Sequence, residues 1–103
     1  MENNFTTANL CLMTGNANPE LAKKIAEYIG VDLFETFVGK FNNGETQVMI
    51  KDSIRGKDIF IIQPTSQPVN DNLMELLIMA DACKRASAGS ITAVVPYYAY
   101  ARQ

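Results

Sequence analysis

Three short apolar segments, widely spaced along the chain, restrict its fold more than any other feature of the sequence. Asn9–Thr14, Ile59–Gln63 and Ile91–Tyr98 have the length of strands and are apolar almost throughout. That pattern is typical of strands buried on both faces. A segment with helical periodicity precedes each of the last two. Strands that alternate with helices form parallel sheets through crossover connections, so we expect an α/β domain with a mainly parallel sheet and helices on both faces.

The first helical segment has clear signals at both ends. Asn18 is suited to cap the helix, Pro19 to its first turn, and Gly30 to a left-handed residue that ends it. Between these positions the apolar side chains recur at helical spacing and form one stripe, which predicts an amphipathic helix lying on the sheet.

The second helical segment, 71–86, has too many apolar residues for a helix that rests on one sheet. Asn72 and Glu75 have the spacing of a capping box. Asp71, Glu75 and Asp81 do not converge on one face, so we interpret them as caps and solvent contacts and not as metal ligands. The apolar residues of the first two turns are Leu73, Met74, Leu76, Leu77, Ile78 and Met79. We therefore expect a second layer or a partner chain to cover part of this helix.

Between the two helices the sequence predicts an inserted β-hairpin. Leu33–Phe41 and Thr46–Ile50 are β-like, and the Asn-Gly pair between them is a strong turn signal. The turn is one letter away from a phosphate-binding loop, but Glu45 stands where that loop needs a lysine and would repel phosphate. Two interpretations remain: a plain hairpin tip, or a tip where Asn43 and Glu45 bind the polar edge of a nucleoside.

Two other groups of residues also allow two interpretations. Ser53, Arg55 and Gly56 have the chemistry of an anion-binding turn, although such turns are more often simply solvated. Tyr97, Tyr98 and Tyr100 could stack on a base or could pack at an interface. These tyrosines follow the last predicted strand, and open α/β sheets bind ligands beyond the carboxyl ends of their strands.

Composition excludes several classes of protein. With 103 residues, 48% of them hydrophobic and 19% charged, the chain has the composition of one small globular domain and not of a disordered segment. We assign residues 9–103 to this domain and residues 1–8 to a polar lead. The net charge of −2 disfavours unspecific binding to nucleic acid, which requires a basic surface.

The sequence contains no histidine, and its two cysteines, Cys11 and Cys83, lie in segments that we expect to be buried. This excludes the usual Cys/His zinc sites and any Ser/His or Cys/His catalytic pair within the chain. So few cysteines fit a reducing compartment. Residues 1–8 lack the basic and apolar regions of a signal peptide, and no apolar run could span a membrane. We therefore predict a cytoplasmic domain.

Four motifs resemble those of the ribose-phosphate pyrophosphokinase family, and they occur in the family's order. They are FNNGET at Phe41–Thr46, DSIRGKD at Asp52–Asp58, NDNLMELLIM at Asn70–Met79 and PYYAYARQ at Pro96–Gln103. The resemblance implies the N-terminal domain of a type I phosphoribosyltransferase-like fold.

The resemblance also implies a reaction. Enzymes of this family use Mg²⁺ to transfer diphosphate from ATP to ribose 5-phosphate, giving phosphoribosyl pyrophosphate and AMP. Their catalytic loop, metal ligands and ribose-phosphate loop lie beyond the position of Gln103. We therefore expect neither a catalytic residue nor a metal ligand in this chain, which would be inactive without the missing C-terminal domain. The alternative is a non-catalytic synthetase-like subunit that regulates or binds the enzyme.

By position, the resemblance assigns five residues to ATP binding and three to regulation. Phe41 would stack on adenine from a neighbouring subunit, with Asn43 and Glu45 at its polar edge. Arg102 would lie on the other adenine face with Gln103 beside it, an arrangement suited to a cation–π contact. The resemblance further implies a homo-oligomer formed through this domain and no binding to nucleic acid or membrane. The positions that match the family's regulatory phosphate or ADP site are Ser53, Arg55 and Ser87.

Overall fold

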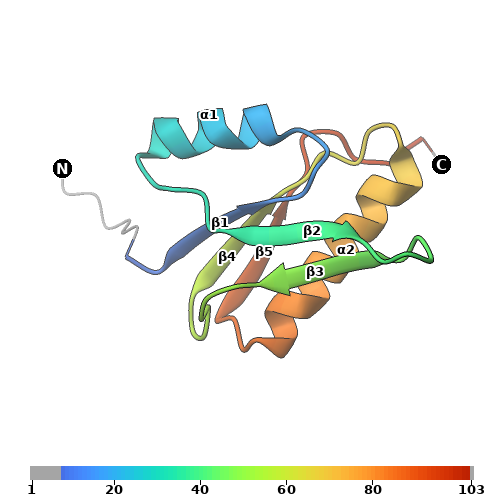
Figure 1. The fold of residues 1–103 in the computed structure, drawn as a ribbon. Helices are drawn as coiled ribbons and strands as arrows, with labels where there is room; N and C mark the ends of the chain where they lie inside the picture. Colours follow the sequence, from blue (N-terminus) through green and yellow to red (C-terminus); the bar gives the residue numbers. More distant parts are fainter. Residues whose placement is uncertain (1–7, 103) are drawn as a thin grey trace.

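The computed structural model describes residues 8–102 and confirms the α/β architecture (Figure 1). A parallel sheet has the strand order β1-β4-β5, and an antiparallel hairpin of β2 and β3 is inserted between α1 and β4. The elements are β1 (Leu10–Thr14), α1 (Pro19–Ile29), β2 (Thr36–Lys40), β3 (Thr46–Ile50), β4 (Asp58–Ile62), α2 (Val69–Arg85) and β5 (Ser90–Val94).

The parallel sheet separates two hydrophobic layers, because alternate residues of its strands point to opposite faces. On one face Leu12 and Ile62 pack against Ala22 and Ala26 of α1. On the other face the buried residues of the sheet and of α2 form one cluster with Ile54. Figure 1 shows α1 and α2 on opposite sides of the sheet. The predicted placement of helices on both faces is therefore confirmed.

The predicted ends of α1 are confirmed in detail. The backbone N–H of Leu21 donates to Asn18 Oδ1 at 3.1 Å, which satisfies one of the free donors of the first turn. Pro19 is the first helical residue, and Gly30 ends the helix with φ of 85°. Local sequence alone determines these ends, since each depends on one side chain or on the lack of one.

The predicted start of α2 was wrong by two residues, and the predicted capping box is not formed. The helix begins at Val69, and its N-cap, Pro68, makes no side-chain hydrogen bond. Asn72 and Glu75 both lie inside the helix, where they are buried and bonded to other elements. The interpretation of Glu75 as a cap or solvent contact was also wrong, because tertiary hydrogen bonds take its carboxylate into the interior.

The strand predicted over residues 91–98 was expected to be buried, and that prediction was wrong. β5 forms over Ser90–Val94, but Ile91 is 36% exposed and the first four residues of the strand all face solvent. The reason is its position: among the described residues β5 pairs only with β4, so it is an edge strand. The segment expected from Leu33 also changes role, because Leu33 bridges to Leu12 of β1 and β2 begins three residues later.

The hairpin supplies part of the second layer that the apolar helix predicts. Val38 of β2 and Val48 and Ile50 of β3 pack against the cluster beneath α2, and Figure 1 shows the hairpin running alongside this helix.

Other apolar side chains of α2 remain uncovered, with Leu77 52% exposed. A hollow of about 490 Å³ beside β5 is lined by Thr65, Leu73, Leu76, Leu77, Ala93, Val95, Tyr98, Ala99 and Tyr100.

Candidate nucleotide site

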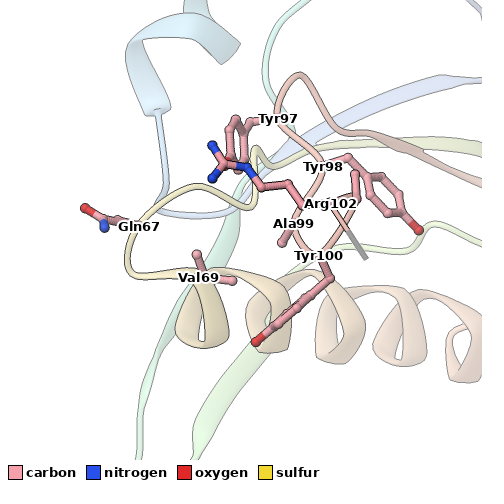
Figure 2. A pocket seen from close by; sticks show the side chains of 8 residues that line it. Gln67, Val69, Tyr97, Tyr98, Ala99, Tyr100 and Arg102 are labelled. Carbon is pink, nitrogen blue, oxygen red and sulfur yellow. The ribbon is translucent and has the colours of Figure 1, made fainter.

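The segments that follow β4 and β5 form a cavity of about 380 Å³ beyond the carboxyl ends of these strands (Figure 2). Ligands of open α/β sheets bind in this position. In Figure 2 the Arg102 side chain runs across the cavity toward Tyr97. The lining residues are Gln67, Val69, Tyr97, Tyr98, Ala99, Tyr100, Ala101 and Arg102.

The three tyrosines of this segment are open to solvent, with exposed fractions of 50% for Tyr97, 72% for Tyr98 and 57% for Tyr100. Tyr100 has φ of 63°, a left-handed conformation that non-glycine residues rarely adopt. Its hydroxyl is hydrogen-bonded to Asn70 Oδ1 in the first turn of α2. The aromatic surface is therefore available to a ligand, and a contact with α2 holds its backbone turn.

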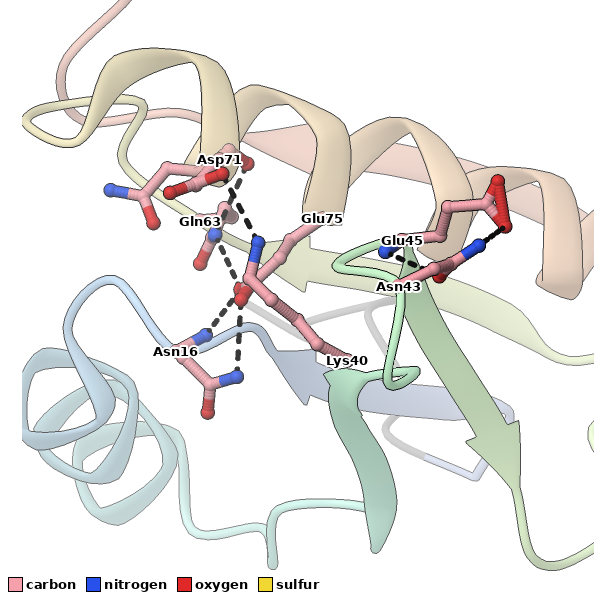
Figure 3. Close-up of polar contacts among 8 residues, drawn as sticks. Asn16, Lys40, Asn43, Glu45, Gln63, Asp71 and Glu75 are labelled. Carbon is pink, nitrogen blue, oxygen red and sulfur yellow. Dashed lines mark hydrogen bonds and ion pairs between the residues drawn. The ribbon is translucent and has the colours of Figure 1, made fainter.

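The tip of the hairpin carries the other group of expected ligand contacts. Phe41 is 50% exposed. The Asn43 side chain donates to Glu45 Oε1 at 3.0 Å and accepts from the Glu45 backbone N–H at 3.1 Å (Figure 3). Gly44 supplies the positive φ of 92° that closes the turn. These hydrogen bonds hold the side chains of Asn43 and Glu45 in place, and the aromatic side chain of Phe41 belongs to the same loop.

A second cavity of about 380 Å³ separates this tip from α2, and an ion pair bridges the two elements. Lys40 Nζ donates to Asp71 Oδ1 at 3.1 Å, with both side chains about half exposed. The rest of the lining combines polar tip residues with an apolar helix face: Phe41, Gly44, Glu45, Thr46, Met74 and Ile78.

The two cavities share no lining residue, although both border the first turn of α2 through Val69 and Asp71. Phe41 and Arg102 therefore belong to different cavities of one chain. Gln103, the fifth residue expected at the ATP site, lies outside the described residues.

A buried polar network between these regions was missed by sequence reasoning. Glu75 is 7% exposed, and its Oε1 accepts from the Asn16 backbone N–H at 2.8 Å and from Gln63 Nε2 at 3.0 Å (Figure 3). Asn16 Nδ2 donates both to Glu75 Oε2 at 3.2 Å and to the Val38 carbonyl of β2 at 2.8 Å. One carboxylate thus joins the turn after β1, the end of β4 and, through Asn16, the hairpin.

Gln63 completes the network and explains a glycine in the turn after β1. The Gln63 side chain is fully buried, donates to the Asn72 carbonyl at 3.2 Å and accepts from the Ala17 backbone N–H at 3.2 Å. A Cβ on Gly15 would lie 2.4 Å from Gln63 Oε1, so a larger residue there would have to displace this buried amide from its hydrogen bonds. The available sequence signals were a glutamine ending an apolar strand and a carboxylate among apolar helix residues.

The three residues expected at a regulatory site do come from segments that lie against each other. The Arg55 backbone N–H donates to Ser53 Oγ at 3.4 Å, which shapes the turn before β4. The Gly56 backbone N–H donates to the Ser87 carbonyl at 2.9 Å. Ser53, Arg55 and Ser87 are all exposed, so their side chains are accessible to an anion.

The described residues contain no metal-binding cluster, no reactive cysteine and no membrane-spanning helix. Within residues 8–102, no three His, Cys, Asp or Glu side chains are placed together to hold a metal ion. Burial raises the pKa of the Cys83 thiol to about 11, and it also raises the pKa of Cys11. Both cysteines are therefore neutral core residues and poor nucleophiles. None of the helices in this range has the length and apolar character needed to cross a membrane.

Comparison with known proteins agrees with the four motifs. Residues 10–103 match the family model for the N-terminal domain of ribose phosphate pyrophosphokinase. A ribose-phosphate pyrophosphokinase of Pasteurella multocida is 60% identical over 92 residues, which is 89% of this chain and 29% of the relative. One from Clostridium perfringens is 56% identical over 103 residues, all of this chain and 32% of the relative.

A solved structure extends the comparison to the fold. The phosphoribosylpyrophosphate synthetase of Mycobacterium smegmatis superposes with a TM-score of 0.88 at 47% identity, over 91% of this chain and 32% of the other. The chain thus spans about a third of the length of these relatives. A family model that covers nearly the whole chain establishes its membership: the chain belongs to the ribose-phosphate pyrophosphokinase family and corresponds to its N-terminal domain.

Proposed function

We propose that this chain supplies the purine-binding part of a ribose-phosphate pyrophosphokinase, an enzyme that transfers diphosphate from ATP to ribose 5-phosphate. The products are phosphoribosyl pyrophosphate and AMP. The observation that carries the proposal is the pair of cavities at the first turn of α2, one bordered by Phe41 and the other by Arg102.

Each cavity supplies a different half of the purine contacts. Phe41 offers one aromatic face, and the linked side chains of Asn43 and Glu45 offer donors and acceptors to the base edge. Arg102 offers a planar cation to the other face of the base, and Gln103 lies beside it in the sequence. We propose that the two halves come from two subunits of a homo-oligomer; their placement in different cavities of one chain supports this arrangement.

Binding alone does not carry out the transfer, which depends on positioning and on stabilisation of developing phosphate charge. Among the described residues near the two cavities only Arg102 and Lys40 bring positive charge, and Asp71 already pairs with Lys40. Mg²⁺ would supply charge stabilisation in the complete enzyme, held by residues outside this chain. The site residues here would hold ATP, and the rest of the enzyme would complete the reaction.

The 103-residue chain is therefore expected to form no AMP from ATP and ribose 5-phosphate with Mg²⁺. Purified chain at high concentration, assayed by chromatography for AMP, would check this against a complete synthetase as positive control. AMP formation that requires ribose 5-phosphate and persists through repeated purification would contradict the proposal.

Replacing Phe41 by alanine in a complete synthetase is expected to raise KM for ATP about fivefold, since a stacking contact contributes about 1 kcal/mol. KM for ribose 5-phosphate should not change. Phe37→Ala is the matched control, because Phe37 lies on the same hairpin and is 43% exposed. An unchanged KM for ATP in Phe41→Ala, or an equal rise in Phe37→Ala, would remove Phe41 from the site.

The regulatory assignment is part of the same proposal. Ser53, Arg55 and Ser87 would bind phosphate or the phosphates of ADP, with the Arg55 guanidinium supplying charge-assisted hydrogen bonds. The hydrogen bond from Gly56 to Ser87 supports this assignment, because the bond brings the two segments within reach of one anion.

The reducing, cytoplasmic location expected from the cysteine content also remains part of the proposal.

A further inference from the structure

Thr65, in the segment after β4, contacts the segment that carries Arg102. Thr65 is 2% exposed, and its hydroxyl donates to the Tyr97 carbonyl at 2.9 Å. The same oxygen accepts from the Ala99 backbone N–H at 2.7 Å. The Thr65 backbone N–H also donates to the Tyr97 carbonyl, at 2.9 Å. One buried side chain thus holds the chain on both sides of residue 98.

We propose that Thr65 is a positioning residue for Arg102, an inference that rests on the function proposed above. The hydroxyl fixes the path of residues 97–99, and Arg102 follows three residues later in the same cavity wall. The hydrogen bond between Tyr100 and Asn70 also holds this segment, but it joins exposed side chains, whereas the Thr65 hydroxyl is buried. Thr65 therefore contributes to the position of the guanidinium by fixing the backbone that leads to Arg102.

The chemistry of the hydroxyl makes this role testable with near-isosteric variants. A hydroxyl donates one hydrogen bond and accepts another, and Thr65 uses both at once. Valine has the same shape but can do neither, so Thr65→Val leaves the Ala99 N–H and one lone pair of Tyr97 unsatisfied. Serine keeps the hydroxyl and loses only a methyl group, so Thr65→Ser should preserve the path of the segment.

The experiment uses the complete synthetase that contains this sequence, with KM for ATP, KM for ribose 5-phosphate and kcat measured for each variant. Thr65→Val is expected to raise KM for ATP about tenfold, since small displacements of binding groups have large effects. Thr65→Ser should remain within about twofold of the parent. KM for ribose 5-phosphate should not change. Thr92→Val, the same replacement at an exposed position of β5, is the control.

A double-mutant cycle separates positioning from a general loss of stability. If Thr65 acts through Arg102, adding Thr65→Val to Arg102→Ala should raise KM for ATP no further. Equal effects in both backgrounds would overturn the inference. In the 103-residue chain, Thr65→Val should also accelerate hydrogen exchange of the Ala99 amide, whereas Thr92→Val should not.

The outcomes also distinguish this inference from the function on which it rests. If Arg102→Ala leaves KM for ATP unchanged, the proposed purine site itself is wrong. If Arg102→Ala raises KM for ATP and Thr65→Val does not, the site stands and the positioning role is overturned. An unchanged exchange rate at Ala99 in Thr65→Val would likewise overturn it.

Discussion

Replacing Glu75 by alanine is expected to lower the free energy of unfolding of this chain by about 2–3 kcal/mol. The carboxylate accepts three hydrogen bonds, two of them from Asn16 and one from Gln63. Gln63 is fully buried, so after the replacement one of its N–H groups has no partner and no access to water. Denaturation in urea, followed by circular dichroism, would measure the change.

Asp81→Ala provides a matched control on the same helix. Asp81 pairs with Arg85 at 2.8 Å, but both side chains are exposed, and exposed pairs of this kind contribute little to stability. A loss well below 1 kcal/mol is expected there. If Glu75→Ala were no more destabilising than Asp81→Ala, the network would not contribute to stability as its burial indicates.

Loss of Glu75 should also loosen the hairpin, since Asn16 carries the link from this carboxylate to the Val38 carbonyl. Faster hydrogen exchange across β2 and β3 would report that effect, and the β1–β4 pairing should be less affected. Phe41, which we propose contacts the purine, lies at the end of the same hairpin, so the structural network and the proposed site are physically connected.

Features that depend on local residues could be predicted from the sequence. Asn18 and Gly30 fix the ends of α1, and the Asn-Gly turn fixes the hairpin connection, because each acts through one or two neighbouring residues. The parallel order of the main strands followed from the alternation of apolar strands and helices. The resemblance of four motifs led to the family, and the comparisons confirm it.

Features that depend on distant partners could not be predicted in this way. Glu75 and Gln63 are bonded to each other. Glu75 is also bonded to Asn16, 59 residues away in the sequence, and Gln63 to Ala17, 46 residues away, so no local spacing indicates their roles. The exposure of β5 depends on its lack of a second neighbouring strand among the described residues, and an apolar strand pattern does not reveal that position. The separation of Phe41 from Arg102 into two cavities is likewise a property of the assembled fold.

Replacing Gly89 by alanine is expected to cost about 2 kcal/mol of stability, because the added Cβ has no space. It would lie 2.7 Å from the Gly56 carbonyl oxygen and 3.0 Å from its carbon. These are backbone atoms, and the Gly89 and Gly56 amides already bond to the opposite segment, at Lys57 and Ser87. Neither segment can therefore move without losing hydrogen bonds. Thermal and urea unfolding would measure the loss.

Gly30→Ala separates this steric effect from backbone strain. Gly30 has φ of 85° but no atom within 4 Å of an added Cβ, so its replacement should cost about 1 kcal/mol through conformation alone. Only Gly89→Ala should accelerate hydrogen exchange of the Gly56 amide, because only that variant pushes the two segments apart.

The same separation would move Ser53 and Arg55 away from Ser87. In a complete synthetase, Gly89→Ala should therefore weaken the response to phosphate or ADP, while Gly30→Ala should not. A normal response in a Gly89→Ala enzyme with accelerated Gly56 exchange would contradict the proposed anion site between these two segments.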